Sequence, residues 1–313
     1  MPASRVRAVV LLALCASAAP VVHASAQGDR FAPIVLQLPA SAHAAALGDA
    51  FLTARDPDVL FYDPAQLALA RGLSVGAGRY GSAATVVSLS AATAFGGSGG
   101  VGIGAQVLSY TGPVGHDPVS ARALGSDGPV AAASVAFTVG GAGVWHDTRF
   151  GAAVKFAGDM RDGARGSVLA ADLAVARDVG ARKNIAVALV ASDLGPDLRV
   201  DDVRTQLPSR VSLGVGRDGI ELGPVDLGLT GAVSLLRDGS LGAAAGGEIE
   251  YEWLDGYSVA ARAGVRQADR VSGERMHGTG TLGLGLGADR VSLDYAFARE
   301  AGVNVHHIGL RLR

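Results

Sequence analysis

The chain has 313 residues, of which 18% are charged, and its formal net charge is -2 with histidine neutral. That balance gives no electrostatic reason to expect a nucleic-acid partner, and the charged share is below the roughly one quarter of an ordinary soluble domain. Hydrophobic residues make up 49%, yet aromatic residues make up only 5% and glycines number 45, so alanine, valine and leucine supply much of the apolar content.

Residues 1–26 have the pattern of a secretory signal peptide. A basic start and an apolar core over residues 8–16 precede an Ala-Ser-Ala cleavage sequence that ends at Ala26. We therefore expect cleavage near Ala26 and a mature chain that starts at Gln27. The single cysteine, Cys15, lies inside this leader, so the mature chain is expected to form neither disulfides nor thiolate metal sites.

Residues 34–72 lack the alternation of a β-strand and are predicted to form short helices. Asp56 and Asp63 each precede a proline, which is the pattern of an N-cap residue followed by proline at the first helical position. The rest of the chain is predicted below to form a barrel, and two short helices ahead of a barrel predict a plug inside its periplasmic mouth. With Asp58, the two aspartates could instead hold calcium, but they do not follow the EF-hand spacing, and helix capping accounts for two of the three.

The same stretch resembles the PorV/PorQ family of outer-membrane proteins, which are relatives of the FadL-type barrels. The family pattern is a proline followed by small residues, then a Gly-Asp/Gly-Ala-Phe centre, then an aromatic-Asn-Pro-Ala-x-Leu end. The matching residues are Pro39, Ala40, Ser41, Gly48, Asp49, Ala50, Phe51, Tyr62, Asp63, Pro64, Ala65, Gln66 and Leu67. The departure is Asp63, where the family usually has asparagine; either residue can cap a helix, but aspartate adds a charge.

This resemblance implies a fold and two classes of function. Beyond the plug motif, the count of fourteen strands and the overall length agree with the family. Family members act in type IX secretion, where PorV carries exported proteins to the cell surface, or in the passage of hydrophobic compounds. The plug motif of Gly48, Asp49, Ala50, Phe51, Tyr62, Asp63, Pro64 and Ala65 is therefore the candidate functional segment.

After residue 72 the sequence alternates between apolar residues and small or polar ones, as a β-strand with two different faces does. Fourteen such strands are predicted, starting near residues 73, 83, 99, 128, 148, 166, 183, 208, 224, 240, 257, 278, 290 and 303. Each predicted strand has about the 9–11 residues that a tilted strand needs to cross a bilayer. No apolar run in the mature chain approaches the roughly 18 residues of a membrane-spanning helix. We therefore predict an all-β, 14-stranded antiparallel transmembrane barrel over residues 73–313, with residues 27–72 as its plug.

Loop lengths and aromatic residues support this prediction independently of the alternation. The predicted outer connections include the long ones, residues 111–129, 159–165, 194–207 and 268–276, whereas the inner ones are mostly short, with residues 140–147 as an exception. A periplasmic aromatic girdle is predicted from Phe95, Phe137, Phe150, Tyr251, Trp253 and Tyr257, and the candidates for an outer girdle are Tyr80 and Tyr110.

The face opposite the lipid-facing one carries charges on several of the last strands. The predicted lumenal charges are Glu248, Glu250, Glu252, Arg262, Arg266 and Asp294. Opposite charges on neighbouring strands fit a lumenal ladder that holds the wall together. The alternative is that these charges grip the plug or set the permeability of the lumen.

Two other patterns do not point to a site. Residues 214–219 read Gly-x-Gly-x-x-Gly, but a turn into another strand follows, whereas a dinucleotide site needs a helix there. His306 and His307 are adjacent in a strand and point to opposite faces, so they cannot bind one metal ion together. Because the chain also lacks the common hydrolase, phosphate-loop and zinc-protease sequences, we expect no enzyme, no cofactor and no metal.

Three functional hypotheses remain open. The first is a non-enzymatic barrel that handles exported proteins, with outer-membrane lipid, exported cargo or secretion components as partners, no nucleic acid and a monomeric barrel. The second is a FadL-like conduit for hydrophobic small molecules. A tightly filled lumen favours the first, and a continuous apolar cavity under residues 48–51 favours the second. The third is a secreted soluble all-β protein, whose strands would also alternate; the small residues on the non-apolar face favour a crowded lumen instead.

Overall fold

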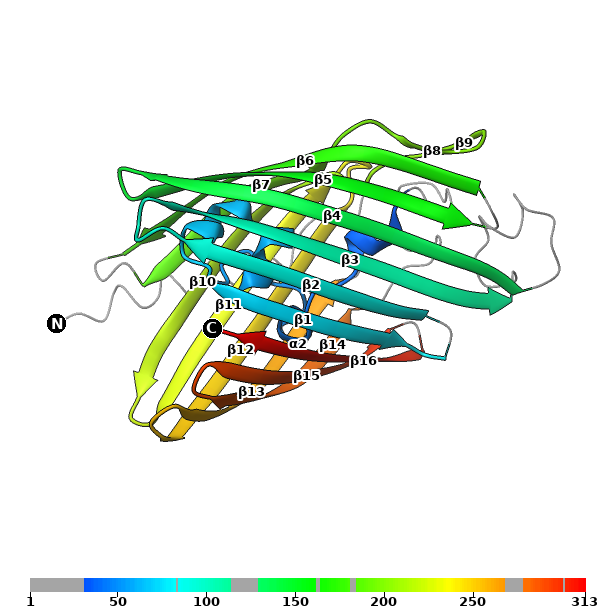
Figure 1. Ribbon diagram of the computed structural model, residues 1–313. Helices are drawn as coiled ribbons and strands as arrows, with labels where there is room; N and C mark the ends of the chain where they lie inside the picture. The colour runs from blue at the N-terminus through cyan, green and yellow to red at the C-terminus, as the bar shows by residue number, and fades with distance from the viewer. Residues whose placement is uncertain are drawn as a thin grey trace.

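The computed structural model describes residues 31–82, 84–113, 129–161, 164–180, 184–267, 278–300 and 302–313. The predicted signal peptide lies outside these residues. Within them, fourteen strands form one closed antiparallel barrel, in which β1 pairs with β16 to complete the ring (Figure 1). The all-β barrel that the alternation predicts is therefore confirmed.

The strands follow one another around the wall in chain order. They are β1 (Gly72–Tyr80), β2 (Ala84–Ala94), β3 (Gly99–Pro113), β4 (Pro129–Trp145), β5 (Thr148–Arg161), β6 (Ala164–Val179), β7 (Ile185–Leu194), β10 (Arg210–Leu222), β11 (Val225–Leu236), β12 (Leu241–Leu254), β13 (Tyr257–Gln267), β14 (Thr279–Ala288), β15 (Val291–Glu300) and β16 (Val303–Leu312). Each begins within two residues of its predicted start. An additional hairpin of β8 (Leu198–Val200) and β9 (Val203–Thr205) lies in the connection between β7 and β10, which was predicted as a long outer connection.

The two ends of the barrel differ, and we name them for their connections. The short-turn end carries turns at residues 95–98, 146–147, 223–224, 255–256 and 289–290, and the long-loop end carries the β8–β9 hairpin. In Figure 1 the C-terminus marks the short-turn end on the left, and the hairpin lies on the right. Two predicted connections are wrong: β4 continues to Trp145, leaving a two-residue turn in place of a loop at 140–147, and β5 and β6 occupy most of residues 159–165.

The outward face of the wall is apolar. Leu282, Leu284 and Leu286 are 62%, 58% and 53% exposed, and Val139 and Leu169 reach 62% and 61%. Apolar exposure that repeats on strand after strand is far larger than the patches that soluble monomers tolerate. A closed barrel with this outer surface is suited to hydrocarbon, because its strands hydrogen-bond one another around the whole ring and leave no open edge.

The predicted inner aromatic girdle is largely in place. Phe95, Phe150, Tyr251, Trp253 and Tyr257 all lie near the short-turn end and are 40% to 53% exposed. A ring of exposed aromatic side chains at one level is typical of a membrane interface, where their amphipathic rings are favoured. Trp145 at the end of β4, which is 67% exposed, adds a member that the prediction missed.

Three aromatic predictions are wrong. Phe137 faces outward but lies in the middle of β4, opposite Phe156 of β5, rather than at an end. Tyr80 and Tyr110 were the candidates for an outer girdle, but both pack against a buried cluster inside the barrel. The hydroxyl of Tyr80 lies 3.2 Å from His307 Nε2. Tyr80 shares its parity with Ser74 and Gly78, so the alternation that predicts the wall also places this ring in the lumen.

The segment of residues 31–71, which we call the plug, fills the lumen. It contains η2 (Ile34–Gln37), α2 (Ala42–Ala46), η3 (Pro57–Phe61) and η4 (Pro64–Ala68). Helix η2 packs on β3 and β4, α2 on β14 and β15, η3 on β2 and η4 on β4 and β5. None of the helices in the described part of the chain is long and apolar enough to cross a membrane.

The plug lies so close to the wall that the lumenal face needs glycine. A Cβ atom at Gly151 would lie 2.2 Å from the backbone nitrogen of Ala65, and one at Gly264 would lie 2.3 Å from that of Gly48. No larger residue fits at these positions without moving the backbone. This close approach explains why the non-apolar face of many strands consists of glycine, alanine and serine.

The outward orientation of Leu284 makes a testable prediction. An arginine there would face lipid in the middle of β14 and should lower the free energy of unfolding by about 2–4 kcal/mol, and Leu312→Arg at the end of β16 by about 0–1 kcal/mol. Urea unfolding in lipid vesicles would measure both. Equal small effects would mean that the face is solvated by water. Gly283 is no suitable lumenal control, because a Cβ there would lie 2.4 Å from the Cβ of Ala46.

Candidate functional site

The residues of the plug motif come together in one small core. The Tyr62 hydroxyl accepts a hydrogen bond from the Ala40 amide at 2.8 Å and donates one to Asp49 Oδ1 at 2.7 Å. The Phe51 ring meets the Tyr62 ring edge-on, with centroids 5.2 Å apart. The three parts of the motif are therefore tied to one another by direct contacts, although residues 42–47 and 52–61 separate them in the sequence.

The Gly-Asp pair of the motif ends helix α2. Gly48 and Asp49 both have left-handed backbone angles, with φ of 65° and 68°. The Gly48 amide donates to the Ala45 carbonyl and the Asp49 amide to the Ala44 carbonyl, at 3.2 and 2.8 Å. This is the pairing of a Schellman ending, which requires a residue that tolerates a positive φ. Ala50 follows, and its carbonyl accepts a hydrogen bond from Thr230 Oγ1 of the wall at 2.8 Å.

Asp63 caps helix η4, as its position before Pro64 predicts. Its Oδ1 accepts a hydrogen bond from the Ala65 amide at 2.8 Å. The side chain is fully buried, and this burial raises the pKa of the carboxyl to about 7. The same burial explains why asparagine, which caps without a charge, is an equivalent residue at this position.

Substitutions at Asp63 should separate capping from charge. The folded-state pKa lies above the unfolded one, so folding binds a proton, and the carboxylate destabilises the plug progressively as the pH rises from about 4 to about 7. Asp63→Asn should therefore match the natural chain at pH 4 and protect the plug better at pH 8. Asp63→Ala loses the cap and should cost about 0.5–2 kcal/mol. Protease sensitivity of residues 34–72 in membranes would report both, and equal protection in the alanine variant would exclude the capping role.

The other two aspartates of this segment have different roles. Asp56 was predicted to cap η3, but its side chain makes no capping bond; it contacts charged groups instead. Asp58 accepts hydrogen bonds from Ser74 and Ser90 of the wall, both at 2.7 Å. Among the residues that the structure describes, no group of three histidine, cysteine or acidic side chains is placed to hold a metal ion.

Six charged side chains form a closed ring between the plug and the wall, which we call the charge ring. Its members in order are His43, Asp56, Arg311, Asp294, Arg262 and Glu248. His43 Nδ1 lies 2.6 Å from Asp56 Oδ2, and His43 Nε2 lies 3.2 Å from Glu248 Oε2. The two guanidinium groups flank Asp294: Arg262 Nη1 at 2.6 Å and Arg311 Nη2 at 2.9 Å. Arg262 also pairs with Glu248, and Arg311 with Asp56.

The charge ring includes three of the predicted lumenal charges and three residues that the prediction missed. Glu248 and Arg262 are direct cross-strand partners on β12 and β13, as a ladder requires. Arg266 lies apart from the ring and pairs with Glu300, with Asp49 at 4.0 Å. The remaining two predicted charges, Glu250 and Glu252, are not members of the ring; Glu252 accepts a hydrogen bond from the Gly256 amide in a turn.

The three members of the charge ring that the prediction missed differ in how far the sequence indicates them. Arg311 shares its parity with His307 on the last strand, so the alternation alone could have placed it in the lumen. His43 is a single histidine in an alanine-rich helix, and nothing near it in the chain marks it as charged. Asp56 was noted for a different role.

A second buried charge cluster lies in the wall. Lys155 Nζ of β5 lies 2.9 Å from Asp172 Oδ2 and 2.7 Å from Asp193 Oδ1, and all three side chains are almost fully buried. The Asp193 amide donates to Asp172 Oδ1 at 2.8 Å. The cluster sits where the register between β6 and β7 shifts, and Asp193 has a φ of 56°. Lys155 therefore compensates two carboxylates at an irregular point of the sheet.

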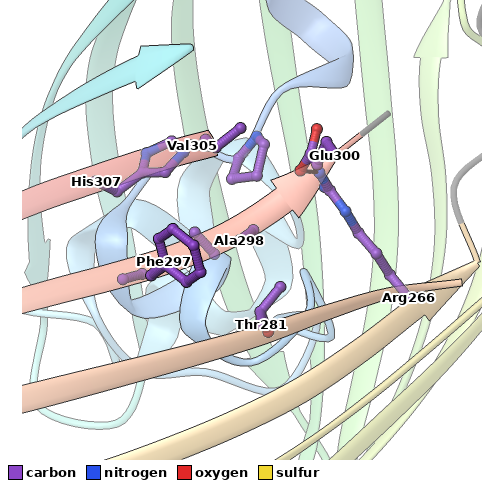
Figure 2. A pocket seen from close by; sticks show the side chains of 10 residues that line it. Arg266, Thr281, Phe297, Ala298, Glu300, Val305 and His307 are labelled. Carbon is purple, nitrogen blue, oxygen red and sulfur yellow. Dashed lines mark hydrogen bonds and ion pairs between the residues drawn. The ribbon is translucent and has the colours of Figure 1, made fainter. Parts of the chain in front are cut away.

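Little space remains between the plug and the wall. Figure 2 shows a cavity between the plug and β14–β16, with Thr281, Ala298 and Val305 on its wall and Arg266 beside Glu300 at one side. Its volume is about 10 Å³, room for about one water molecule. The plug residues 48–51 are not among its lining residues. Between α2 and β14–β16, the described side chains therefore fill the lumen almost completely.

Comparisons with known proteins identify the fold. No family model and no curated protein sequence matches the chain. Solved structures do: the CymD monoaromatic hydrocarbon channel has a TM-score of 0.55 at 10% identity, covering 82% of this chain and 91% of that one. A Pseudomonas aeruginosa FadL homologue has a TM-score of 0.56 at 10% identity, and the match covers 88% of this chain and 99% of the homologue. The Pseudomonas putida toluene transporter TodX has a TM-score of 0.55 at 12% identity, and the match covers 92% of this chain and 98% of TodX.

The match to TodX extends into the plug. The 92% share of this chain that matches TodX is larger than the residues outside the plug can supply. The chain therefore shares with FadL-like proteins a fourteen-stranded barrel and part of its N-terminal segment. The comparisons support the FadL side of the expected resemblance and do not single out PorV or PorQ.

Proposed function

We propose that this chain is an outer-membrane conduit for small apolar compounds, and that the plug is its gate. The observation that carries the proposal is a closed barrel of the FadL-like fold whose lumen is filled by a segment outside the hydrogen-bonded wall. The solved neighbours are described as channels or transporters for monoaromatic hydrocarbons and toluene. These descriptions support the FadL-like hypothesis more than the exported-protein hypothesis.

The way the plug is held supports a gating role. The strands of the wall hydrogen-bond one another around the complete ring, so the wall does not depend on the plug for its closure. Apart from the backbone bond between Ala32 and Gln206 at the long-loop end, the plug is attached through side chains: Ser74 and Ser90 to Asp58, Thr230 to the Ala50 carbonyl, Thr281 to the Ala46 carbonyl, and the charge ring. Contacts of this kind can break and reform without opening the sheet, because no strand pairing is lost.

Handling of exported proteins is the second candidate function. Two observations favour it: the plug motif resembles the PorV/PorQ pattern at every quoted position except Asp63, and the cavity between α2 and β14–β16 is small and is not lined by residues 48–51. A barrel that only displays or carries a protein at its long-loop end needs no open lumen. The β8–β9 hairpin would then be part of the contact surface.

Uptake measurements distinguish the two candidates. The full-length chain would be expressed in a bacterium without such a channel, and the initial uptake of radiolabelled toluene would be compared with that of a charged solute of similar size. The conduit predicts faster toluene uptake and no change for the charged solute. Uptake equal to that of cells with an empty vector would overturn it. Recovery of exported proteins on the barrel together with unchanged uptake would establish the second candidate.

A further inference from the structure

Both ring nitrogens of His43 face a carboxylate, one on the plug and one on the wall. Nδ1 faces Asp56 at 2.6 Å and Nε2 faces Glu248 at 3.2 Å. A neutral imidazole has one donor nitrogen and one acceptor nitrogen, so it would turn a lone pair toward one of the two carboxylates. Only the protonated ring donates to both. The geometry of the closed plug is therefore that of an imidazolium.

The charges around His43 complete the same pattern. With a proton on His43, positive and negative groups alternate around the whole charge ring, three of each. Without it, three carboxylates face two guanidinium groups, and one carboxylate loses its cation. Phe51 lies edge-on to the imidazole, with centroids 5.2 Å apart, and closes that side of the ring to solvent.

We propose that His43 is a proton-operated latch: its imidazolium holds the plug closed by bridging Asp56 of the plug and Glu248 of the wall, and loss of the proton releases it. This goes beyond the proposed function, which requires a movable plug but does not say what moves it. The latch needs no ligand, so its test does not depend on any transported compound.

The sign of the pH dependence follows from the surroundings of His43. Burial, Arg262 and Arg311 disfavour the charged ring, whereas Asp56, through its charge and its hydrogen bond, favours it, and the pKa of His43 is raised above 6.5 as a result. The closed state therefore binds the proton more tightly than an open, solvated state does. Its extra stability is fully present below pH 6.5 and is lost as the pH rises through the raised pKa.

The sequence makes a direct measurement possible. The only cysteine is in the predicted leader, so a single reporter can be placed in the plug at Ala45, which lines the small cavity. Labelling of Ala45→Cys by a maleimide in membranes reports plug opening. Dividing its rate by that of Ser98→Cys, in an exposed turn, removes the intrinsic pH dependence of the thiol. Both are made in the Asp63→Asn background, since Asp63 also titrates in this range.

The latch predicts a normalised labelling rate that is low and constant below pH 6.5 and then rises by up to about tenfold per pH unit, the limit for one linked proton. His43→Gln, neutral at every pH, should label fast at pH 6 and show no slope. Glu248→Gln keeps the imidazole but removes one carboxylate, which lowers the closed-state pKa of His43 toward the open-state one, so its rise should be smaller and should level off at a lower pH. Heat-modifiable migration in gels confirms that each barrel is folded.

The latch would be overturned if the normalised labelling rate of the protein with His43 did not change with pH. It would also be overturned if the rate in His43→Gln rose with pH as steeply as in that protein. If labelling follows the predicted profile but toluene uptake is absent, the latch stands and the conduit fails. If uptake occurs without any pH dependence of labelling, the conduit stands and the latch fails.

Discussion

Joining α2 to β16 by a disulfide is expected to stop the uptake of toluene. A Cβ atom at Gly309 would lie 3.4 Å from the Cβ of Ala42, close to the 3.5–4.5 Å that a disulfide spans. The oxidised Ala42→Cys/Gly309→Cys protein should hold the plug against the wall, because the covalent bond replaces contacts that can otherwise break. Uptake should fall to that of cells without the protein and return on addition of a reductant.

The two single-cysteine variants are the controls for this prediction. Each changes one side chain, but neither forms a link between the plug and the wall, so oxidation should leave their uptake unchanged. Mass spectrometry of the plug peptide would establish that the double variant is fully crosslinked. Unchanged uptake in the crosslinked protein would mean that compounds pass without displacement of the plug, and the gating role would have to be abandoned.

Removing the charge of Lys155 should be the most destabilising single change in the wall. Lys155→Met keeps a long side chain but leaves the buried carboxylates of Asp172 and Asp193 without a cation. Breaking a buried ion pair by removing one partner costs about 3–5 kcal/mol, because the remaining charge is uncompensated. The free energy of unfolding, measured by urea titration in lipid vesicles, should fall by that amount.

Arg237 provides the matched comparison. It forms a similar pair with Asp197 at 2.9 Å, but the two side chains are 40% and 35% exposed. Solvent screens such a pair, so Arg237→Met should change the free energy of unfolding by about 0–1 kcal/mol. If the two methionine variants were equally stable, burial of the Lys155 cluster would not be contributing to the wall as the structure implies.

The alternation of the sequence predicts the wall well, and there is a physical reason for this. A barrel strand meets two different surroundings on its two faces, so each residue carries information about its own orientation. This holds even for Tyr80, which was misplaced only because its aromatic character was given more weight than its parity. The turn at residues 146–147 was mistaken for a longer loop because the glycines before it, Gly140, Gly141 and Gly143, belong to β4, where only Gly140 packs against the plug.

The charge ring could not be predicted in the same way. Asp63 was assigned correctly because a cap is a local structure, decided by the next two residues. Asp56 has the same local signature, a proline after it, but its contacts are His43 in another helix and Arg311 in the last strand. Neither the spacing nor the composition near Asp56 contains that information, since the closure of the barrel brings these residues together.

The first described residues of the plug lie at the opposite end of the barrel from the last residue of the chain. The Ala32 amide bonds the Gln206 carbonyl at 2.9 Å, next to the β8–β9 hairpin, whereas Arg313 follows β16 at the short-turn end (Figure 1). The position of an affinity tag therefore matters. A tag fused ahead of Phe31 would stand in the mouth of the long-loop end and obstruct anything that enters there, whereas a tag after Arg313 would leave that mouth free for transport assays.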